Sequence, residues 1–242
     1  MAESLVIIPT YNEKENIEDI IKYVFSMSDL FDILIVDDNS PDRTADIVRN
    51  LQAEYPKRLH LLNRKEKEGL GKAYIAGFKW ALERDYKYIF EMDADFSHPP
   101  KNLLLMHEIL NNDEADVVIG SRYLKGRIGV ANWDLKRILL SYFASLYVRI
   151  ITQIPVRDTT AGFVGYRKKV LQELNLDEIE FVGYAFQIEM KFKAWKKGFR
   201  IKEIPIVFVD RQKGKSKMHG SIISEAALGV LKLKWKSLRS KL

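Results

Sequence analysis

Cysteine and long apolar runs are missing from this sequence. Without cysteine the chain has no disulfide, thiolate nucleophile or thiolate metal site, which fits a cytoplasmic protein. The longest apolar run, residues 138–148, is bounded by Arg137 and Arg149 and is too short to span a bilayer. Residues 1–4 lack the basic and apolar regions of a signal peptide, so we expect none.

Signatures of several ligand-binding classes are also absent. The net charge of +6 comes with no zinc-finger spacing, basic zipper or RNP aromatic motif, so we expect no nucleic-acid partner. Gly69-Leu70-Gly71-Lys72 lacks the spacing of an ATP-binding phosphate loop, because Glu66 stands where its first glycine belongs. No G-x-G-x-x-G follows the first apolar run, which disfavours a dinucleotide site. The glycines favour a loop-to-helix turn, with Lys72 either solvated or in contact with a phosphate.

Short apolar runs alternate with segments of helical periodicity, in a chain that is 47% hydrophobic and 30% charged, as in ordinary soluble proteins. Asn12, with Glu15 three residues later, predicts an N-cap and capping box for the first helix. The alternation predicts an α/β fold with a parallel sheet and right-handed crossovers. Strands are predicted at residues 5–8, 33–36, 59–62, 86–90 and 115–120, and helices near residues 17–24, 44–51, 71–82 and 134–151.

Two carboxylates, Asp93 and Asp95, follow the predicted strand at residues 86–90. Open α/β sheets bind their ligands at the carboxyl ends of the strands. Oxygen ligands on a short, stiff stretch suit Mg²⁺ or Mn²⁺ carrying a diphosphate. An EF-hand is excluded, because His98 and Leu104 stand where its glycine and glutamate belong. Taken alone, an Asp-x-Asp also occurs in ordinary acidic turns, so its meaning depends on the other motifs.

Four motifs together resemble family 2 inverting glycosyltransferases, and among them the polyprenyl-phosphate (dolichyl-phosphate) mannose synthases. They are residues 7–13 (IIPTYNE), 36–42 (VDDNSPD), 69–73 (GLGKA) and 92–95 (MDAD), in the family's order. The resemblance runs from about Leu5 to Lys217. It implies a GT-A fold with a Rossmann-like, mostly parallel central sheet and helices on both faces. It also implies a nucleotide-diphosphate sugar donor and a divalent ion, Mg²⁺ or Mn²⁺.

The same resemblance divides the chain. Residues 1–220 are expected to form a single GT-A catalytic domain. Within it, residues 1–113 are the nucleotide-sugar-binding half, and residues 114–220 are the acceptor half with a basic loop. Residues 221–242 are expected to form a basic amphipathic C-terminal helix.

The donor site follows from the resemblance by motif match. Asp93, Asp95 and Ser97 are candidate metal ligands, although many relatives carry glutamine in place of this serine. Asp95, Arg211 and Lys217 are the candidate catalytic residues. On the residues alone, simpler structural roles stay open, in which Pro9 only ends a strand and Glu13 only stabilises a helix N-terminus. The resemblance places at the nucleotide sugar Pro9, Tyr11, Glu13, Val36, Asp38, Asp93, Ala94, Asp95, Arg211 and Lys217.

The acceptor site is expected in the second half of the chain. Arg122 stands in the family's Gly-Ser-Arg, and Arg137 and Ser141 lie four residues apart on one face of a predicted helix. In the family, residues at these positions look like ligands of the acceptor phosphate, and a fork of donors suits a phosphate. A surface arginine beside a helix-satisfied serine is the alternative. Residues 158–163 match D-x-T-S-G-F except that Ala161 replaces the serine, which puts only a hydroxyl role in doubt.

The expected reaction is transfer of mannose from GDP-mannose to a polyprenyl (dolichyl-type) monophosphate with inversion. A monophosphate is largely dianionic at neutral pH, since its second pKa is about 6, so no protein base is expected. Three alternatives stay open. The donor is a UDP-sugar such as UDP-glucose, the acceptor is a polysaccharide, or the chain is a non-catalytic nucleotide-binding subunit of a membrane complex.

A membrane-anchored acceptor requires the protein to reach a membrane surface, and we expect peripheral binding at the cytoplasmic face. Leu231, Trp235, Leu238 and Leu242 recur at helical spacing, with basic residues on the other faces. This stripe contacts either lipid or the protein's own core, and residues 138–148 are the competing membrane contact. A membrane-protein partner is left open.

Overall fold

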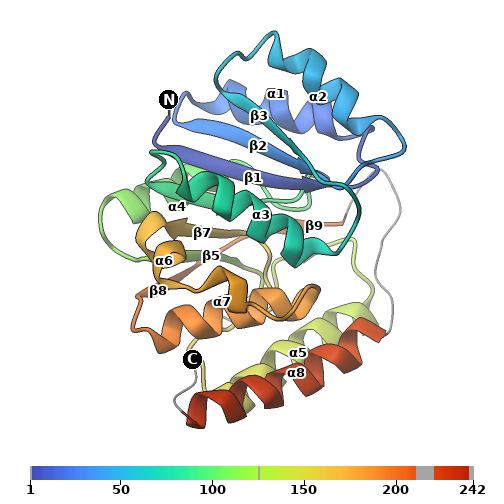
Figure 1. Ribbon diagram of the computed structural model, residues 1–242. Helices are drawn as coiled ribbons and strands as arrows, with labels where there is room; N and C mark the ends of the chain where they lie inside the picture. The colour runs from blue at the N-terminus through green and yellow to red at the C-terminus, as the bar shows by residue number, and fades with distance from the viewer. Residues whose placement is uncertain (1, 125, 211–220, 240–242) are drawn as a thin grey trace.

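The computed structural model describes residues 2–124, 126–210 and 221–239 (Figure 1). Its centre is a seven-stranded sheet in the order β3-β2-β1-β4-β7-β5-β8. Six strands run parallel, and β7 is antiparallel to both of its neighbours. The strands are β1 (Ser4–Thr10), β2 (Phe31–Asp37), β3 (Leu59–Asn63), β4 (Tyr88–Glu91), β5 (Val117–Ser121), β7 (Val164–Arg167) and β8 (Ile201–Pro205). The α/β class and the mostly parallel sheet predicted from the sequence are therefore confirmed.

Helices cover both faces of this sheet, which explains why its strands are apolar without alternation. In β1, Leu5 and Ile7 belong to one buried apolar cluster, and Val6 and Ile8 belong to the other. The first cluster also contains residues of α3 (Leu70–Leu82), α6 (Lys168–Glu173) and α7 (Tyr184–Lys196). The second contains residues of α1 (Ile17–Met27), α2 (Thr44–Gln52) and α4 (Asn102–Asn111).

Two long helices complete the molecule on the side of α7. α5 (Leu135–Thr152) and α8 (Ser221–Leu238) lie side by side beyond the sheet, and α8 also packs on α7 (Figure 1). A short ladder pairs β6 (Val130–Ala131) with β9 (Phe208–Val209), and a 3-10 turn spans Leu176–Glu178. The sheet runs through both parts of the chain, since β4 pairs with β7. The functional division into a donor half and an acceptor half stays a prediction.

The first helix begins later than the capping pattern predicts. Asn12 has a φ of 58°, and the helix begins at Ile17 with Asn16 as its N-cap. Tertiary contacts explain the difference. The backbone N–H of Asn12 donates to Ser40 Oγ at 3.0 Å, and that of Glu13 donates to Thr44 Oγ1 at 3.0 Å. Residues 12–16 therefore form a turn tied to the loop after β2, and asparagine tolerates the left-handed conformation this turn needs.

Candidate active site

A cavity of about 380 Å³ lies at the carboxyl ends of the central strands. Its polar wall comes from the turn after β4, the residue after β5, the start of α5 and the loop before β7. Its apolar wall comes from α5, α7 and α8. The polar wall includes Asp93, Asp95, Ser97, His98, Arg122, Arg137, Ser141 and Thr160, and the apolar wall includes Leu140, Phe143, Tyr147, Val148, Ile188 and Val230. The cavity thus joins residues predicted for the donor's metal to residues predicted for the acceptor.

The acidic turn begins where β4 ends, at Glu91, and is stiffened by its own hydrogen bonds. Asp95 is buried and its Oδ1 accepts the backbone N–H of Ser97 at 3.1 Å. The backbone N–H of Asp93 donates to Nδ1 of His98 at 3.1 Å, and this ring stacks on Phe163. Both aspartates line the cavity, with about a third of the Asp93 side chain (37%) exposed.

Ser97 strengthens the case for a metal at this turn. Its hydroxyl is buried and has no hydrogen-bond partner within the described part of the chain. Buried hydroxyls are normally paired, so this oxygen is suited to a ligand that the protein does not itself supply. No group of three or more acidic or histidine side chains suited to a metal occurs among the described residues. The turn therefore offers two carboxylates and a hydroxyl, the few protein oxygens with which Mg²⁺ or Mn²⁺ binds together with a substrate.

Five of the residues predicted for the nucleotide sugar, those that the family resemblance places at the nucleoside, lie at or just beyond the ends of β1 and β2: Pro9, Tyr11, Glu13, Val36 and Asp38. These strands are adjacent and parallel, with Pro9 in register with Val36. Asp38 is buried and accepts a hydrogen bond from Arg64 Nη1 at 2.8 Å, and burial raises the pKa of this carboxyl. Tyr11 packs under the ammonium of Lys67, 4.4 Å from its ring centre. None of the five lines the described cavity, so the nucleoside role remains a prediction for the adjoining edge of the sheet.

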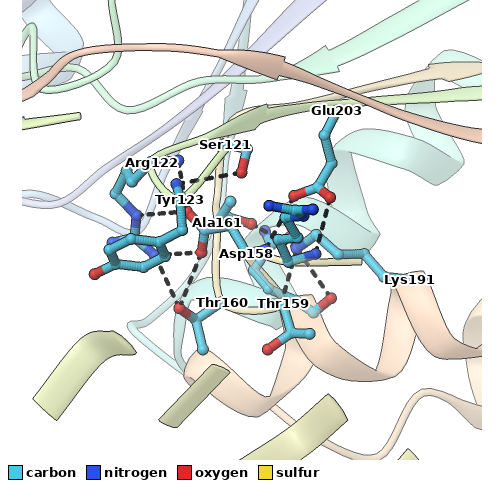
Figure 2. Close-up of polar contacts among 11 residues, drawn as sticks. Ser121, Arg122, Tyr123, Asp158, Thr159, Thr160, Ala161, Lys191 and Glu203 are labelled. Atoms are coloured by element: carbon cyan, nitrogen blue, oxygen red, sulfur yellow. Dashed lines mark hydrogen bonds and ion pairs between the residues drawn. The ribbon is translucent and has the colours of Figure 1, made fainter. Parts of the chain in front are cut away.

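Arg122 lies in the cavity wall and is held by a buried carboxylate (Figure 2). Its Nε and Nη2 each donate to Asp158 at 2.7 Å, and Nη2 also donates to Thr160 Oγ1 at 2.9 Å. Burial disfavours the charged form of Asp158, but the charge and hydrogen bonds of Arg122 outweigh it and lower the pKa of Asp158. The guanidinium is thus fixed in position, and its predicted contact with phosphate remains untested.

Arg137 and Ser141 both face the cavity from the first turns of α5, as their spacing predicts. Arg137 Nη1 donates to Asp210 Oδ2 at 2.7 Å, and its guanidinium lies 4.1 Å from the ring centre of Trp133. About a third of each partner (33% of Arg137 and 31% of Asp210) stays exposed. The remaining predicted cations, Arg211 and Lys217, lie outside the described residues.

A buried polar network supports this site, and sequence reasoning missed it. Glu91 is fully buried, Tyr166 donates to its Oε1 at 3.1 Å, and Gln187 donates to its Oε2. Burial raises the pKa of Glu91 to about 7 and lowers that of Lys191 to about 8. Lys191 Nζ donates to the side-chain oxygen of Gln187 at 3.2 Å. These residues are far apart in the sequence and each resembles an ordinary helix or strand position, so no local signal announced them.

Comparisons with known proteins identify the family of this chain. The model of glycosyl transferase family 2 matches residues 5–174. The chain is 44% identical to undecaprenyl-phosphate mannosyltransferase of Micrococcus luteus, covering 98% of both chains. It is 43% identical to polyprenol monophosphomannose synthase of Mycolicibacterium smegmatis, covering 94% of this chain and 85% of that protein.

Among solved structures, glucosyl-3-phosphoglycerate synthase of Mycobacterium tuberculosis, crystallised with Mn²⁺ and UDP, superposes with a TM-score of 0.70 at 15% identity. The match covers 96% of this chain and 79% of that one. A likeness of this kind shows the fold, and the fold is GT-A. The expected fold and family are therefore both confirmed, and the chain belongs to glycosyl transferase family 2.

Proposed function

We propose that this protein transfers mannose from GDP-mannose to a polyprenyl monophosphate. The observation that carries the proposal is that the Asp93–Ser97 turn lines the same cavity as Arg137, Ser141 and an apolar helical wall. A metal-bound sugar diphosphate needs the acidic turn. A phosphate on a hydrocarbon chain needs the hydrogen-bond donors Arg137 and Ser141 together with the apolar wall. The names of the relatives from Micrococcus luteus and Mycolicibacterium smegmatis, 44% and 43% identical to this chain, support the same acceptor and sugar.

We propose that Asp93, Asp95 and Ser97 hold a divalent ion, Mg²⁺ or Mn²⁺. When bound there, such an ion would neutralise the diphosphate that leaves the sugar. The Asp95 carboxylate is fixed by its hydrogen bond from the Ser97 backbone, and the backbone at Asp93 is held by His98, so the turn is ordered before the ligand arrives. Arg211 and Lys217 are proposed to add positive charge at the same diphosphate.

The acceptor phosphate is proposed to lie against Arg122, Arg137 and Ser141. Because a monophosphate is largely dianionic at neutral pH, with a second pKa of about 6, its oxygen attacks the sugar without a protein base. The role of the chain is to align the two substrates and to exclude water with the apolar wall. One in-line displacement then inverts the anomeric carbon and yields a β-mannosyl phosphate.

The assay that tests this function compares GDP- and UDP-sugars in the presence of a polyprenyl phosphate and divalent metal. We expect lipid-linked product from GDP-mannose that disappears with a chelator. Product from UDP-glucose instead would replace the donor assignment. Transfer to a polysaccharide alone, or nucleotide binding without any transfer, would contradict the proposed function.

Membrane binding is proposed to use α5 and α8. No helix among the described residues is long and apolar enough to cross a bilayer. Large apolar side chains are nevertheless exposed on both helices, and α8 buries Val230 and Leu233 instead of the predicted stripe. The exposure of Leu231, Trp235 and Leu238 supports the lipid alternative for the stripe, and Leu242 lies outside the described residues. The exposed side chains are Leu135, Leu139, Leu140, Tyr142, Phe143 and Ile150 of α5, and Leu228, Leu231, Trp235 and Leu238 of α8.

Flotation with anionic liposomes tests this contact. Replacing Leu231, Trp235 and Leu238 with serine should weaken binding on the order of 10- to 100-fold, since each loses apolar burial in the interface. These residues are 49%, 54% and 72% exposed, so the fold should be retained. The matched control is serine at Leu104 and Leu105, which are exposed on α4. Equal binding by wild type and the triple variant would assign the contact to α5 or exclude it.

A further inference from the structure

The loop of residues 158–162 enters the cavity between Arg122 and a lysine buried in α7 (Figure 2). Lys191 has no exposed surface, and its ammonium donates to the backbone oxygens of Ala161 at 2.6 Å and Thr159 at 3.2 Å. On the opposite flank, Arg122 is bonded to the side chains of Asp158 and Thr160. The loop is thus held by charged side chains on both flanks.

The ammonium also determines which way the peptide groups of this loop point. A trans peptide is planar, so its N–H points opposite to its C=O, and the described chain contains no cis peptide. Because the carbonyls of Thr159 and Ala161 point to Lys191, the N–H groups of Thr160 and Gly162 point away from it. Both residues are partly exposed and both line the cavity.

Neither of these N–H groups donates a hydrogen bond within the described residues, whereas most buried or half-buried backbone donors are paired. Two donors without a partner among the described residues, on the side of the loop away from Lys191 and beside a fixed guanidinium, are suited to binding an anionic oxygen, and we call them the cradle.

We propose that the N–H groups of Thr160 and Gly162 bind an oxygen of the acceptor phosphate, and that Lys191 is the positioning residue that aims them. The inference rests on the proposed function and adds a subsite to it. The alternative ligand of the same chemistry is the donor diphosphate. The turn proposed to bind the metal lines the same cavity, but the acceptor is favoured because Arg122, proposed to contact the acceptor phosphate, is hydrogen-bonded to Thr160 of the loop itself.

The first test is the variant Lys191→Met, which keeps an unbranched side chain one atom shorter and removes the ammonium group. We expect the KM for polyprenyl phosphate to rise about tenfold or more, equivalent to the loss of a charge-assisted hydrogen bond, with GDP affinity changed less than about twofold. The matched control is Lys193→Met on the same helix. Lys193 bonds Glu189 at 3.0 Å and the backbone oxygen of Glu178 at 2.8 Å, away from the loop. Equal acceptor KM values for wild type and Lys191→Met would overturn the proposal.

The second test needs no variant and decides the matter if Lys191→Met fails to fold. Amide NMR spectra of the wild-type protein are recorded with inorganic phosphate, with farnesyl phosphate and with GDP plus Mg²⁺. We expect the Thr160 and Gly162 amide protons to shift downfield with farnesyl phosphate, because charge-assisted hydrogen bonds are strong. A response to GDP and Mg²⁺ alone, or to none of the three, would overturn the assignment. A protein that transferred no sugar would refute the proposed function, while these shifts would still report on the cradle.

Discussion

Asp95→Asn should reduce sugar transfer by at least about a thousandfold while leaving the fold intact, because it removes charge from the proposed metal site. The side-chain oxygen of asparagine can still accept the Ser97 backbone N–H, now 3.1 Å from Asp95 Oδ1. The loss of sugar transfer should therefore come from the missing charge and not from misfolding. Transfer is measured with GDP-mannose and a polyprenyl phosphate over a range of Mg²⁺ and Mn²⁺ concentrations, beside a thermal melt.

Asp93→Ala is the companion variant, and it separates metal binding from turnover. Asp93 is the more exposed of the two carboxylates, so we expect its loss chiefly to weaken metal-dependent donor binding, measured by calorimetry with and without the ion. Exposed Asp46 on α2 provides the control, as Asp46→Ala lies outside the cavity. Wild-type turnover by Asp95→Asn in a chelator would refute the metal assignment.

Arg137→Ala should raise the KM for polyprenyl phosphate roughly 10- to 100-fold, the cost of losing hydrogen bonds to a charged group. Donor affinity should change less than about twofold, because Arg137 is proposed to contact only the acceptor. Steady-state kinetics with varied acceptor and titration calorimetry with GDP-mannose measure the two effects separately. A large loss of donor affinity with unchanged acceptor kinetics would contradict the assignment.

Two further variants show whether Arg137 acts on the ligand or only on its neighbour. Arg137 is bonded to Asp210, so a purely structural arginine would make Arg137→Ala and Asp210→Asn equally harmful. We expect Asp210→Asn to retain acceptor use, since the guanidinium remains over Trp133. Lys136→Ala is the helix control, because Lys136 is exposed on the same turn and does not line the cavity.

The order of strands as far as β5 was predictable because the strands of this sheet are covered on both faces, whereas β7 and β8 were not predicted. That burial requires continuous apolar runs such as residues 5–8, whose members divide between the two core clusters. The position of Asp93 and Asp95 followed from the same pattern, since a carboxylate directly after a buried strand must lie at the end of the sheet. That Arg137 and Ser141 lie on the same face of their helix was also predictable, because four residues complete about one helical turn.

Contacts between distant segments were not predictable from local patterns. The capping pattern at Asn12 was overridden because the backbone there bonds side chains of the loop after β2. Arg122 was expected at a phosphate, and the structure adds that Asp158 holds two of its donors, a pairing across 36 positions. Lys191 is an ordinary helix residue in the sequence and acquires its importance only through the carbonyls packed around it.

The C-terminal helix shows most directly what the sequence determined and what the tertiary structure decided. Its sequence determined an amphipathic helix with apolar residues at helical spacing and many cations, which the structure contains as Ser221–Leu238. The same spacing could not say which apolar residues would be covered, because periodicity describes a helix and not its neighbours. Tertiary packing against α5 and α7 decided it, burying Val230 and Leu233 and leaving Leu231 and Trp235 in contact with solvent.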